Sequence, residues 1–455
     1  MWQRLLQIKT QLLAHEGFRR YGANTAWLMG EKILRMFIGL FVGIWVARYL
    51  GPEQFGLLSY AQSFVFLFTA VATLGLDSIV VRELVRDESQ RDVLLGTSFT
   101  LKLIGSICIL PLLWVAVQFT SNDSYTNLLI FIIASGTIFQ SFNVIDFYYQ
   151  STVKSKYVAF ANTITLGLSS IIKIVLILNN ASLTAFAIVG VFDSAILGLG
   201  LIYFYTLKSH HLISPWCLDV SLAIRLLLDS WPLAIGSFAA IIYMQIDQVM
   251  IGTLKDSRYV GYYAVAVKLS TLWLFITTTI VSTFSPYFTK IFQKNIEMFD
   301  CRLQLIYNIL MKLSFLICIT IYLNSDFIII YLYGKDYQPA VNILDIYIWS
   351  NIFVFMSNAS WLFYINHELH KIASYRLVVG AIINVLLNFY LIPLYSLKGA
   401  AVATLISYFI SSYLVNIFFQ DTRKNFIFQT RAIINVFNIK SWLPSNYIRV
   451  LYENK

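Results

Sequence analysis

Residues 24–47 read NTAWLMGEKILRMFIGLFVGIWVA, and the second half of this stretch contains no charged residue. A helix needs about 20 predominantly apolar residues to cross the hydrocarbon core of a bilayer. The strands of a membrane β-barrel are shorter and alternate between apolar and polar residues, which this stretch does not do. It therefore predicts a membrane-spanning helix.

The same pattern recurs along the chain and predicts an all-α polytopic membrane protein. Turn-forming residues separate several of the apolar runs, at Gly51-Pro52, Asn179-Asn180 and Gly334. We expect about twelve transmembrane helices in two six-helix lobes. The predicted spans are 24–47, 57–77, 93–118, 127–150, 157–178, 184–207, 231–254, 261–288, 303–323, 340–364, 372–392 and 398–420.

The composition agrees with this fold class. Of 455 residues, 58% are hydrophobic and 12% are charged, whereas a soluble domain usually carries about 25% charged residues. These values exclude a disordered chain, because disorder requires low hydrophobicity. They also exclude an ordinary soluble enzyme, because so few polar residues cannot build a surface that faces water.

The basic residues indicate the orientation, because short cytoplasmic loops are rich in Lys and Arg. An even number of spans puts both termini on one side, and that side carries most of the Lys and Arg outside the spans. The opposite loops contain only Arg48, Lys255, Arg258, Lys335 and Lys398. We expect both termini to be cytoplasmic. The net charge of +10 is then an orientation signal that favours contact with anionic membrane lipids, and we expect no nucleic-acid partner.

The order of spans and loops predicts five regions. A match between residues 55–61 and 260–266, at the start of the second span of each half, indicates parallel repeats. The N-terminal region also contains a basic amphipathic stretch from Trp2 to Leu13. The regions are a cytoplasmic basic amphipathic N-terminus (1–23), an N-lobe (24–207), a cytoplasmic linker (208–230), a C-lobe (231–420) and a cytoplasmic tail (421–455).

The first span carries two cations, Lys32 and Arg35, three residues apart, and Gly39 and Gly43 continue the same helical face. Charged residues inside a membrane usually face a partner or a wet cavity. Two cations above a strip of small residues suit an anionic headgroup in a groove. An alternative is that Glu31 pairs with Arg35 at the favourable i,i+4 spacing and that the glycines only permit close helix packing. Lys32 has no such local partner.

Acidic residues also lie inside the predicted spans. Asp247 and Lys268 should both lie roughly 10 Å below the outer surface, on consecutive helices. They could form an ion pair that lines a cavity and breaks during transport, or a fixed pair that holds two helices together. Asp77 lies near a cytoplasmic end, where it caps a helix or pairs, and Asp193 lies deeper in its span.

The sequence lacks the common signatures of bound cofactors. It contains no nucleotide-binding loop of the form G-x-x-x-x-G-K-[ST], so we expect no ATP hydrolysis by this chain. It contains no Cys or His spacing typical of a metal site. We expect no cofactor and no metal. An ion or proton gradient, the membrane potential or glycan removal on the far side could supply the energy.

Five short motifs stand in order along the chain. They are Ala47-Arg48-Tyr49-Leu50-Gly51-Pro52-Glu53-Gln54-Phe55-Gly56, Leu74-Gly75-Leu76-Asp77 with Arg82-Glu83-Leu84, Asp247-Gln248-Val249-Met250-Ile251-Gly252 followed by Val260-Gly261-Tyr262-Tyr263, Leu332-Tyr333-Gly334-Lys335-Asp336-Tyr337, and Lys398-Gly399-Ala400-Ala401-Val402-Ala403-Thr404. This set resembles the motifs of the polysaccharide-biosynthesis flippases. These are the Wzx-type transporters of lipid-linked oligosaccharides such as O-antigen repeat units, and they are relatives of the MATE exporters within the MOP superfamily.

The resemblance implies two lobes around a central cavity that opens alternately to each side. It implies a substrate of undecaprenyl pyrophosphate bearing a short glycan, moved across the bacterial inner membrane for O-antigen, lipopolysaccharide or another surface polysaccharide. In such flippases basic residues of the first and eighth spans serve the pyrophosphate. The expected substrate-binding cations are Lys32, Arg35, Lys268 and Arg48, and the expected cavity or coupling acids are Asp247, Asp77 and Asp193.

The same resemblance suggests a chain that functions as a monomer and works with the polysaccharide polymerase and the chain-length machinery. Two other classes compete with a flippase. A MATE-like exporter of drugs or organic cations should place unpaired acids in its cavity. A membrane-embedded glycan polymerase should carry a large outward loop, and the longest outward connection here is only 324–339. We therefore expect a transporter and not an enzyme.

Overall fold

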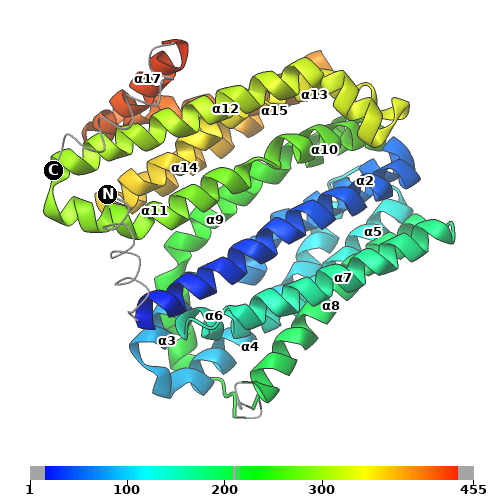
Figure 1. The fold of residues 1–455 in the computed structure, drawn as a ribbon. Coiled ribbons are helices and arrows are strands. Elements are labelled where there is room, and N and C mark those ends of the chain that lie inside the picture. Colours follow the sequence, from blue (N-terminus) through cyan, green and yellow to red (C-terminus); the bar gives the residue numbers. More distant parts are fainter. Residues whose placement is uncertain (1–15, 209–211, 214, 439–455) are drawn as a thin grey trace. The chain divides into compact units, whose positions relative to one another are not determined.

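The computed structural model describes residues 16–208, 212–213 and 215–438, and every regular element in these ranges is a helix. The predicted amphipathic stretch from Trp2 to Leu13 lies outside them. Figure 1 shows the helices in sequence order. They are α2 (Glu16–Thr73), α3 (Asp77–Arg86), η1 (Glu88–Gln90), α4 (Arg91–Val117), α5 (Ser124–Ser135), η2 (Gly136–Asn143), α6 (Val144–Ser151), α7 (Lys156–Leu178), α8 (Leu183–Leu207), α9 (Val220–Leu254), α10 (Ser257–Thr271), α11 (Leu274–Lys294), α12 (Ile296–Tyr333), η3 (Lys335–Tyr337), α13 (Ala340–Tyr347), α14 (Ser350–Asn366), α15 (His370–Phe409), η4 (Ile410–Leu414), α16 (Val415–Phe418), η5 (Gln420–Thr422) and α17 (Arg423–Phe437).

Ten helical stretches in the described part of the chain are long and apolar enough to cross a membrane. Two of them are double length and contain a break. Met29–Arg86 is interrupted at Gly51 (φ 68°), and His370–Phe418 is interrupted at Ser396 (φ 53°). Each of these two stretches therefore holds two of the predicted spans, so the all-α fold with about twelve membrane helices is confirmed.

The span predicted at 127–150 is not a uniform α-helix. Its middle, Gly136–Asn143, is the 3₁₀-helix η2 between α5 and α6. A 3₁₀-helix has three residues per turn, so residues three apart lie on the same edge. Thr137, Gln140 and Asn143 have this spacing, and η2 therefore presents a row of polar side chains.

Many outward-facing side chains of the helices are large and apolar. Leu178, Leu323 and Phe389 are 74%, 72% and 60% exposed. A soluble monomer seldom shows large contiguous apolar patches, whereas lipid tails surround such side chains without cost. The exposed apolar surface thus fits a protein whose helices face lipid.

The chain divides by its internal contacts into two compact units. Among the described residues, unit 1 comprises 16–50 and 61–238, and unit 2 comprises 51–60 and 239–438. Helix α9 therefore begins in unit 1 and ends in unit 2. The five regions predicted from the sequence, including the two lobes, stay a prediction.

Unit 1 is built around α3, α4, α6, α7 and α8. In Figure 1 α7 and α8 run side by side, and they make extensive contact. Its core is apolar and aromatic, and includes Leu76, Leu94, Ile145, Tyr149 and Tyr205, all at most 1% exposed. This packing supports the polar side chains that face the interior of the unit.

In unit 2, helix α12 packs against α14 and α17, α10 packs against α13, and α11 packs against α14. The second half of α9 packs against α15 through Ala239, Tyr243 and Ala381. These contacts bring together polar residues from three membrane helices, α9, α10 and α15.

The two copies of the sequence repeat meet within unit 2. A Cβ atom on Gly56 would collide with the Ser257 carbonyl oxygen, and one on Gly261 would collide with the Pro52 carbonyl oxygen. Arg258 and Glu53 form an exposed ion pair of 3.4 Å beside this crossing. Only glycine permits such a close approach of two helix backbones, which explains both repeat glycines by packing.

Candidate functional site

Unit 1 contains a polar cavity beside a buried lysine, which we name the Lys102 cavity, and its volume is about 290 Å³. Lys102 of α4 is 4% exposed, and its Nζ atom lies 3.4 Å from Oδ1 of Asp77 at the start of α3. The same Nζ lies 4.8 Å from the ring centroid of Phe147. A second carboxylate, Asp146, lines the cavity and accepts a hydrogen bond of 3.1 Å from Gln150. The predicted acid Asp77 is therefore an ion-pair partner.

A second cavity, the Lys173 cavity, has a volume of about 330 Å³. Lys173 of α7 donates a hydrogen bond of 3.1 Å to Oδ2 of Asp193 on α8. The two side chains are 28% and 31% exposed, so the pair borders open space and is not sealed in the core. Asp193, an acid predicted from the sequence, thus lines a cavity with a cation as its partner.

The two cavities share part of their lining. Gln140 and Asn143 of η2, Asn162 of α7 and Leu197 of α8 border both. The cavities are therefore neighbours, and the residues between them are mainly carboxamides. Ion pairs lie on each side, Asp77 with Lys102 and Lys173 with Asp193.

The first-span cations have different surroundings. Arg35 lines the Lys173 cavity, and its Nε atom donates a 2.6 Å hydrogen bond to Oε1 of the buried Glu31. The predicted i,i+4 pair is thus confirmed, while the role of Arg35 in substrate binding stays a prediction. Lys32 and Arg48 are exposed, and neither lines the two cavities described above. A Cβ on Gly39 would meet nothing within 4 Å, so Gly39 does not serve close packing among the described residues.

Unit 2 contains a buried carboxylate in a cluster of neutral polar groups. Asp247 of α9 is 4% exposed. Tyr263 of α10 donates to its Oδ2 at 2.5 Å, and Asn388 of α15 donates to its Oδ1 at 2.5 Å. The Thr404 hydroxyl lies 2.5 Å from Oδ2 and 3.0 Å from the carbonyl oxygen of Ala400. We call Asp247, Tyr263, Asn384, Asn388 and Thr404 the Asp247 cluster.

The Asp247 cluster is not fully hydrogen-bonded. Asn388 donates to Oδ1 of Asn384 at 3.1 Å, but the Asn388 Oδ1 and the Asn384 Nδ2 atoms are buried without a partner among the described residues. Unpaired polar atoms are rare in protein interiors and call for a physical explanation. Here one buried carboxylate of α9 accepts its hydrogen bonds from neutral donors of α10 and α15, so no cationic side chain is needed to satisfy its oxygens.

Lys268 lies on α10 and is partly buried. The partners that the structure gives to the Asp247 carboxylate are hydroxyl and amide groups. Asp247 therefore has neutral hydrogen-bonding partners, and its ion pair with Lys268 stays a prediction. The substrate-binding role of Lys268 stays a prediction.

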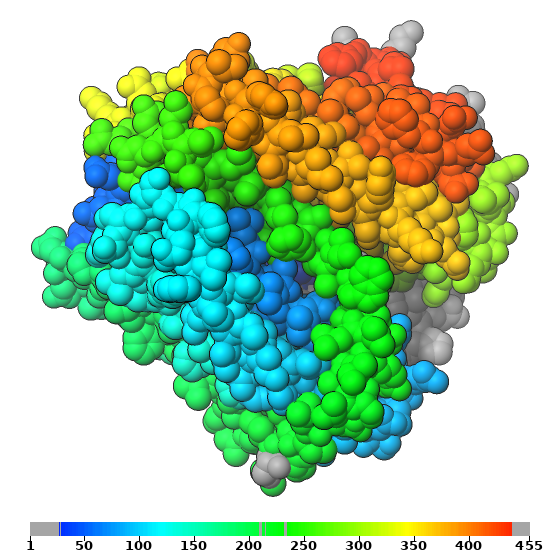
Figure 2. All heavy atoms as spheres, turned by 180° about the vertical axis from the view of Figure 1, so that it is seen from behind, coloured from blue at the N-terminus to red at the C-terminus, as the bar shows by residue number. Residues whose placement is uncertain are grey.

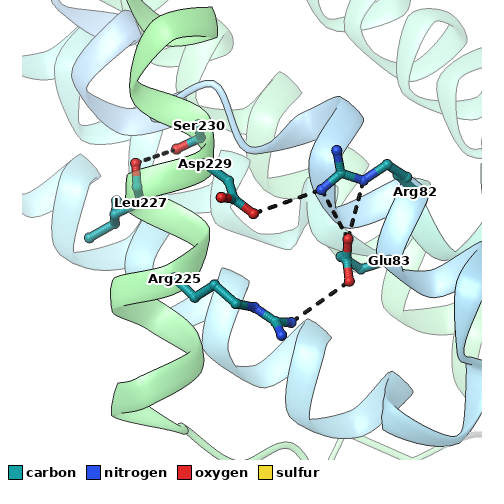
Figure 3. A network of polar contacts seen from close by, with 6 residues as sticks. All are labelled: Arg82, Glu83, Arg225, Leu227, Asp229 and Ser230. Atoms are coloured by element: carbon teal, nitrogen blue, oxygen red, sulfur yellow. Dashed lines mark hydrogen bonds and ion pairs between the residues drawn. The ribbon is translucent and has the colours of Figure 1, made fainter.

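A network of ion pairs joins α3 to the first half of α9 within unit 1 (Figure 3). Glu83 lies 3.0 Å from Arg82 and 3.7 Å from Arg225, and Arg82 also lies 3.8 Å from Asp229. Next to it, Gly75 (φ 66°) approaches α9 so closely that a Cβ would collide with the backbone nitrogen of Ala234. Figure 2 shows the first half of α9 in contact with the α3 region from the opposite side.

These contacts give both parts of one family-like motif a structural explanation. The Leu74–Asp77 motif forms the turn that lies against α9, and Arg82-Glu83-Leu84 supplies the ion pairs and the buried Leu84 of α3. The network consists of partly exposed groups, so each pair contributes little to stability. Its role is to fix α9 against α3.

Sequence reasoning missed the neutral polar residues. The cavities are lined by Gln140, Asn143 and Asn162, and the Asp247 cluster includes Asn384 and Asn388. These residues were not predicted because the sequence argument considered only charged residues inside the spans. A signal was present in the sequence. Asn384 and Asn388 are four apart in an apolar span, so they lie on one helical face.

The comparisons with known proteins come from a family model and from solved structures. The model of the polysaccharide biosynthesis protein family matches residues 21–292. A search of the curated proteins finds no match. Among solved structures, the lipid II flippase MurJ in an inward closed conformation aligns with a TM-score of 0.68 at 16% identity, covering 93% of this chain and 95% of that chain.

Two further structures belong to the MOP superfamily of transporters. An inward-facing multidrug resistance transporter of the MATE family has a TM-score of 0.68 at 12% identity and covers 90% of this chain and 96% of that chain. A MOP superfamily transporter from Pyrococcus furiosus has a TM-score of 0.63 at 12% identity and covers 94% of this chain and 98% of that chain.

These neighbours are transporters and flippases and not enzymes. At such low identity they show a common fold, that of multi-pass membrane transporters, while the family model covers more than half of the chain. The chain belongs to the polysaccharide biosynthesis protein family.

Proposed function

We propose that this chain is a flippase for undecaprenyl-pyrophosphate-linked oligosaccharide repeat units. It moves them from the cytoplasmic to the outer leaflet of the bacterial inner membrane by alternating access, for the synthesis of O-antigen or another surface polysaccharide. In this proposal both termini are cytoplasmic and the chain works as a monomer. The polysaccharide polymerase and the chain-length machinery take over its product.

The observation that carries the proposal is the pair of polar cavities within apolar helices of unit 1. A glycan headgroup cannot cross hydrocarbon unaided, because each unsatisfied polar group there costs several kcal/mol. Cavities lined by ion pairs and carboxamides supply hydrogen-bonding partners within the depth of the membrane. The lipid tail can stay among the outward-facing apolar side chains. Family membership and the similarity to a lipid II flippase agree with this interpretation.

The main alternative is a MATE-like exporter of organic cations. Such a site needs negative charge that is not already neutralised. Two of the three acids that line the cavities, Asp77 and Asp193, each have a lysine within 4 Å, and the third, Asp146, accepts a hydrogen bond from Gln150. The charge balance of the cavities therefore favours the polar glycan part of the substrate over an organic cation. A membrane-embedded polymerase is the third and weaker alternative.

We propose further that Asp247 couples transport to an ion gradient. The cluster buries one carboxylate among neutral hydrogen-bond donors, and the Asn388 Oδ1 atom beside it lacks a partner among the described residues. A monovalent cation or a proton would neutralise the carboxylate there. Transport into vesicles should then follow an imposed sodium or proton gradient. A rate that is the same with and without either gradient would overturn this coupling role.

The experiment that tests the flippase proposal is deletion of the gene followed by analysis of the lipid-linked glycan. The expected result is loss of surface polysaccharide and accumulation of lipid-linked glycan on the cytoplasmic leaflet. Replacement of Lys32 and Arg35 by Ala should have the same effect without loss of folded protein. Accumulation of unpolymerised glycan on the outer leaflet would instead support a polymerase, and normal export would overturn the proposal.

A further inference from the structure

Three carboxamide side chains, those of Gln140, Asn143 and Asn162, lie between the two cavities and border both of them. Gln140 and Asn143 are three residues apart on the 3₁₀-helix η2, so they lie on the same edge of that helix. Asn162 comes from α7, and all three border both cavities. An α-helix would turn Gln140 and Asn143 about 60° apart. The irregular geometry of η2 therefore aligns these two side chains.

These side chains have unused hydrogen-bonding capacity. A carboxamide offers two donors and an acceptor oxygen with two lone pairs. No side-chain hydrogen bond is made by Gln140, Asn143 or Asn162 within the described part of the chain, although nearby hydroxyls are satisfied. Ser106 donates to the Thr137 carbonyl at 3.1 Å, and Thr165 donates to the Ala161 carbonyl at 2.9 Å. The three carboxamides are therefore available to a ligand in the cavities.

The charges around the carboxamides are arranged in pairs. Asp77 with Lys102 lies on one side, and Lys173 with Asp193 lies on the other. Arg35, which also lines the Lys173 cavity, pairs with Glu31. Paired charges offer hydrogen bonds but little net attraction for an ion. A pyrophosphate carries several negative charges and would need unpaired cations. The chemistry between the cavities instead suits neutral groups that both donate and accept hydrogen bonds, which describes the hydroxyls and amides of sugars.

The dimensions agree with sugar rings. The two cavities, at about 290 Å³ and 330 Å³, lie near the lower end of the range of about 300–1,000 Å³ for small-molecule pockets. Each can hold a small polar ring but not a long glycan. Two such spaces with a shared wall fit two successive sugars.

We propose that Gln140, Asn143 and Asn162 bind hydroxyl or amide groups of the first sugars of the glycan, and that the pyrophosphate binds away from these three carboxamides. The inference rests on the flippase function proposed above and specifies which part of the substrate unit 1 recognises. It adds neutral side chains to the charged residues expected from the sequence.

The test measures binding by the full chain in lipid nanodiscs with two probes. One is the lipid-linked glycan extracted from a host that lacks the gene, and the other is undecaprenyl pyrophosphate without sugar. Asn143→Leu and Asn162→Leu keep the side-chain size and remove the hydrogen bonds. Each should weaken binding of the glycan-bearing lipid about tenfold and leave binding of the bare lipid unchanged.

Two controls make the result specific. Thr163→Val, on the same helix as Asn162, alters a residue that lines neither cavity and whose hydroxyl already donates to the backbone, so it should change neither affinity. Asn162→Gln retains the carboxamide and should recover part of the lost affinity. Unchanged melting temperatures establish that each variant is folded.

The outcomes separate this inference from the function on which it rests. If wild-type protein prefers the glycan-bearing lipid and the Leu variants bind it as tightly as wild type, the carboxamide site is wrong and the flippase proposal stands. If the variants lose affinity for both probes equally, the pyrophosphate contacts these residues and the inference is overturned. If wild-type protein binds neither probe, the proposed function fails and this inference fails with it.

Discussion

The cavities of unit 1 and the Asp247 cluster of unit 2 use ionisable residues in opposite ways. In unit 1, Lys173 and Asp193 are about 30% exposed and form an ion pair at the edge of open space. In unit 2, Asp247 is 4% exposed and has hydroxyl and amide partners. The first arrangement can exchange partners with a polar solute. The second holds one carboxylate in a buried position where neutral donors satisfy it. The comparison teaches that open space beside a charged side chain, more than the depth of the residue in its span, indicates whether the side chain can contact a solute.

The largest expected effect concerns Asp247. Asp247→Asn keeps the shape but removes the charge that a coupling cation would neutralise, and it sets an amide donor against the Asn388 donor. We expect the initial transport rate in vesicles to fall at least about 100-fold, which is equivalent to about 2.7 kcal/mol. The matched control is Asp326→Asn, at an exposed position of α12, and it should retain normal transport. Equal rates for Asp247→Asn and wild type would remove the distinction between the two units.

Gly261 tests how tightly unit 2 is packed. Gly261→Ala should destabilise the protein by about 1–3 kcal/mol, because its Cβ would collide with the backbone at Pro52. Gly190→Ala in α8 of unit 1 is the control, since a Cβ there meets nothing within 4 Å. Melting temperatures of the purified protein in detergent measure both variants. A Gly261→Ala protein as stable as Gly190→Ala would contradict the close helix crossing.

The pair in the Lys173 cavity tests whether its charges act only as partners. Lys173→Asp or Asp193→Lys alone should lower transport about tenfold, because a like-charged pair replaces an ion pair of 3.1 Å. The double variant with both changes should recover most of the rate, measured in the same vesicles. A double variant as impaired as the singles would show that one of the two charges has a separate role, and normal single variants would place the cavity outside the transport path.

The smallest effect concerns a carboxylate of unit 1 outside the spans. Asp123 caps α5, where it accepts a 2.9 Å hydrogen bond from the Thr126 backbone. Hydrogen bonds from the Thr126 side chain and backbone hold the pKa of Asp123 below its ordinary value. Asp123→Ala should cost about 1 kcal/mol at neutral pH.

The pH dependence of this cap has a defined sign. A carboxyl whose folded pKa is lowered stabilises the protein above its unfolded pKa, about 3.9, and loses that contribution as the pH falls through the folded value. The difference in melting temperature between wild type and Asp123→Ala should therefore shrink below about pH 4. A difference that stays constant on acidification would show that the carboxylate does not act as the cap.

The sequence predicted the fold well for a simple physical reason. A membrane span is a local property of about 20 residues, so each run of apolar residues could be found separately. The breaks at Gly51, Asn180 and Gly334 also follow from local backbone preferences, and all three have positive φ. The Glu31–Arg35 pair lies within one helix, so its spacing was visible as well.

The site was less predictable because its contacts are long-range. Asp193 was identified, but its partner Lys173 lies on another helix, and the hydrogen-bond partners of Asp247 come from residues up to 157 positions away. The 3₁₀ geometry of η2 has no clear sequence signal, and it is this geometry that aligns Gln140 with Asn143. Lys32 and Arg48 were chosen for their charge, and both are exposed.

Reconstitution with lipid-linked glycan tests the central claim most directly. Purified protein is placed in vesicles with undecaprenyl-pyrophosphate-linked glycan in both leaflets, and an enzyme or lectin added outside measures the accessible fraction over time. Our account predicts that the accessible fraction rises from about half to nearly all with the wild-type protein. It predicts no such rise with Asp247→Asn. Vesicles that contain wild-type protein and behave like protein-free vesicles, under an imposed ion gradient of either kind, would contradict the proposal that this chain is a flippase.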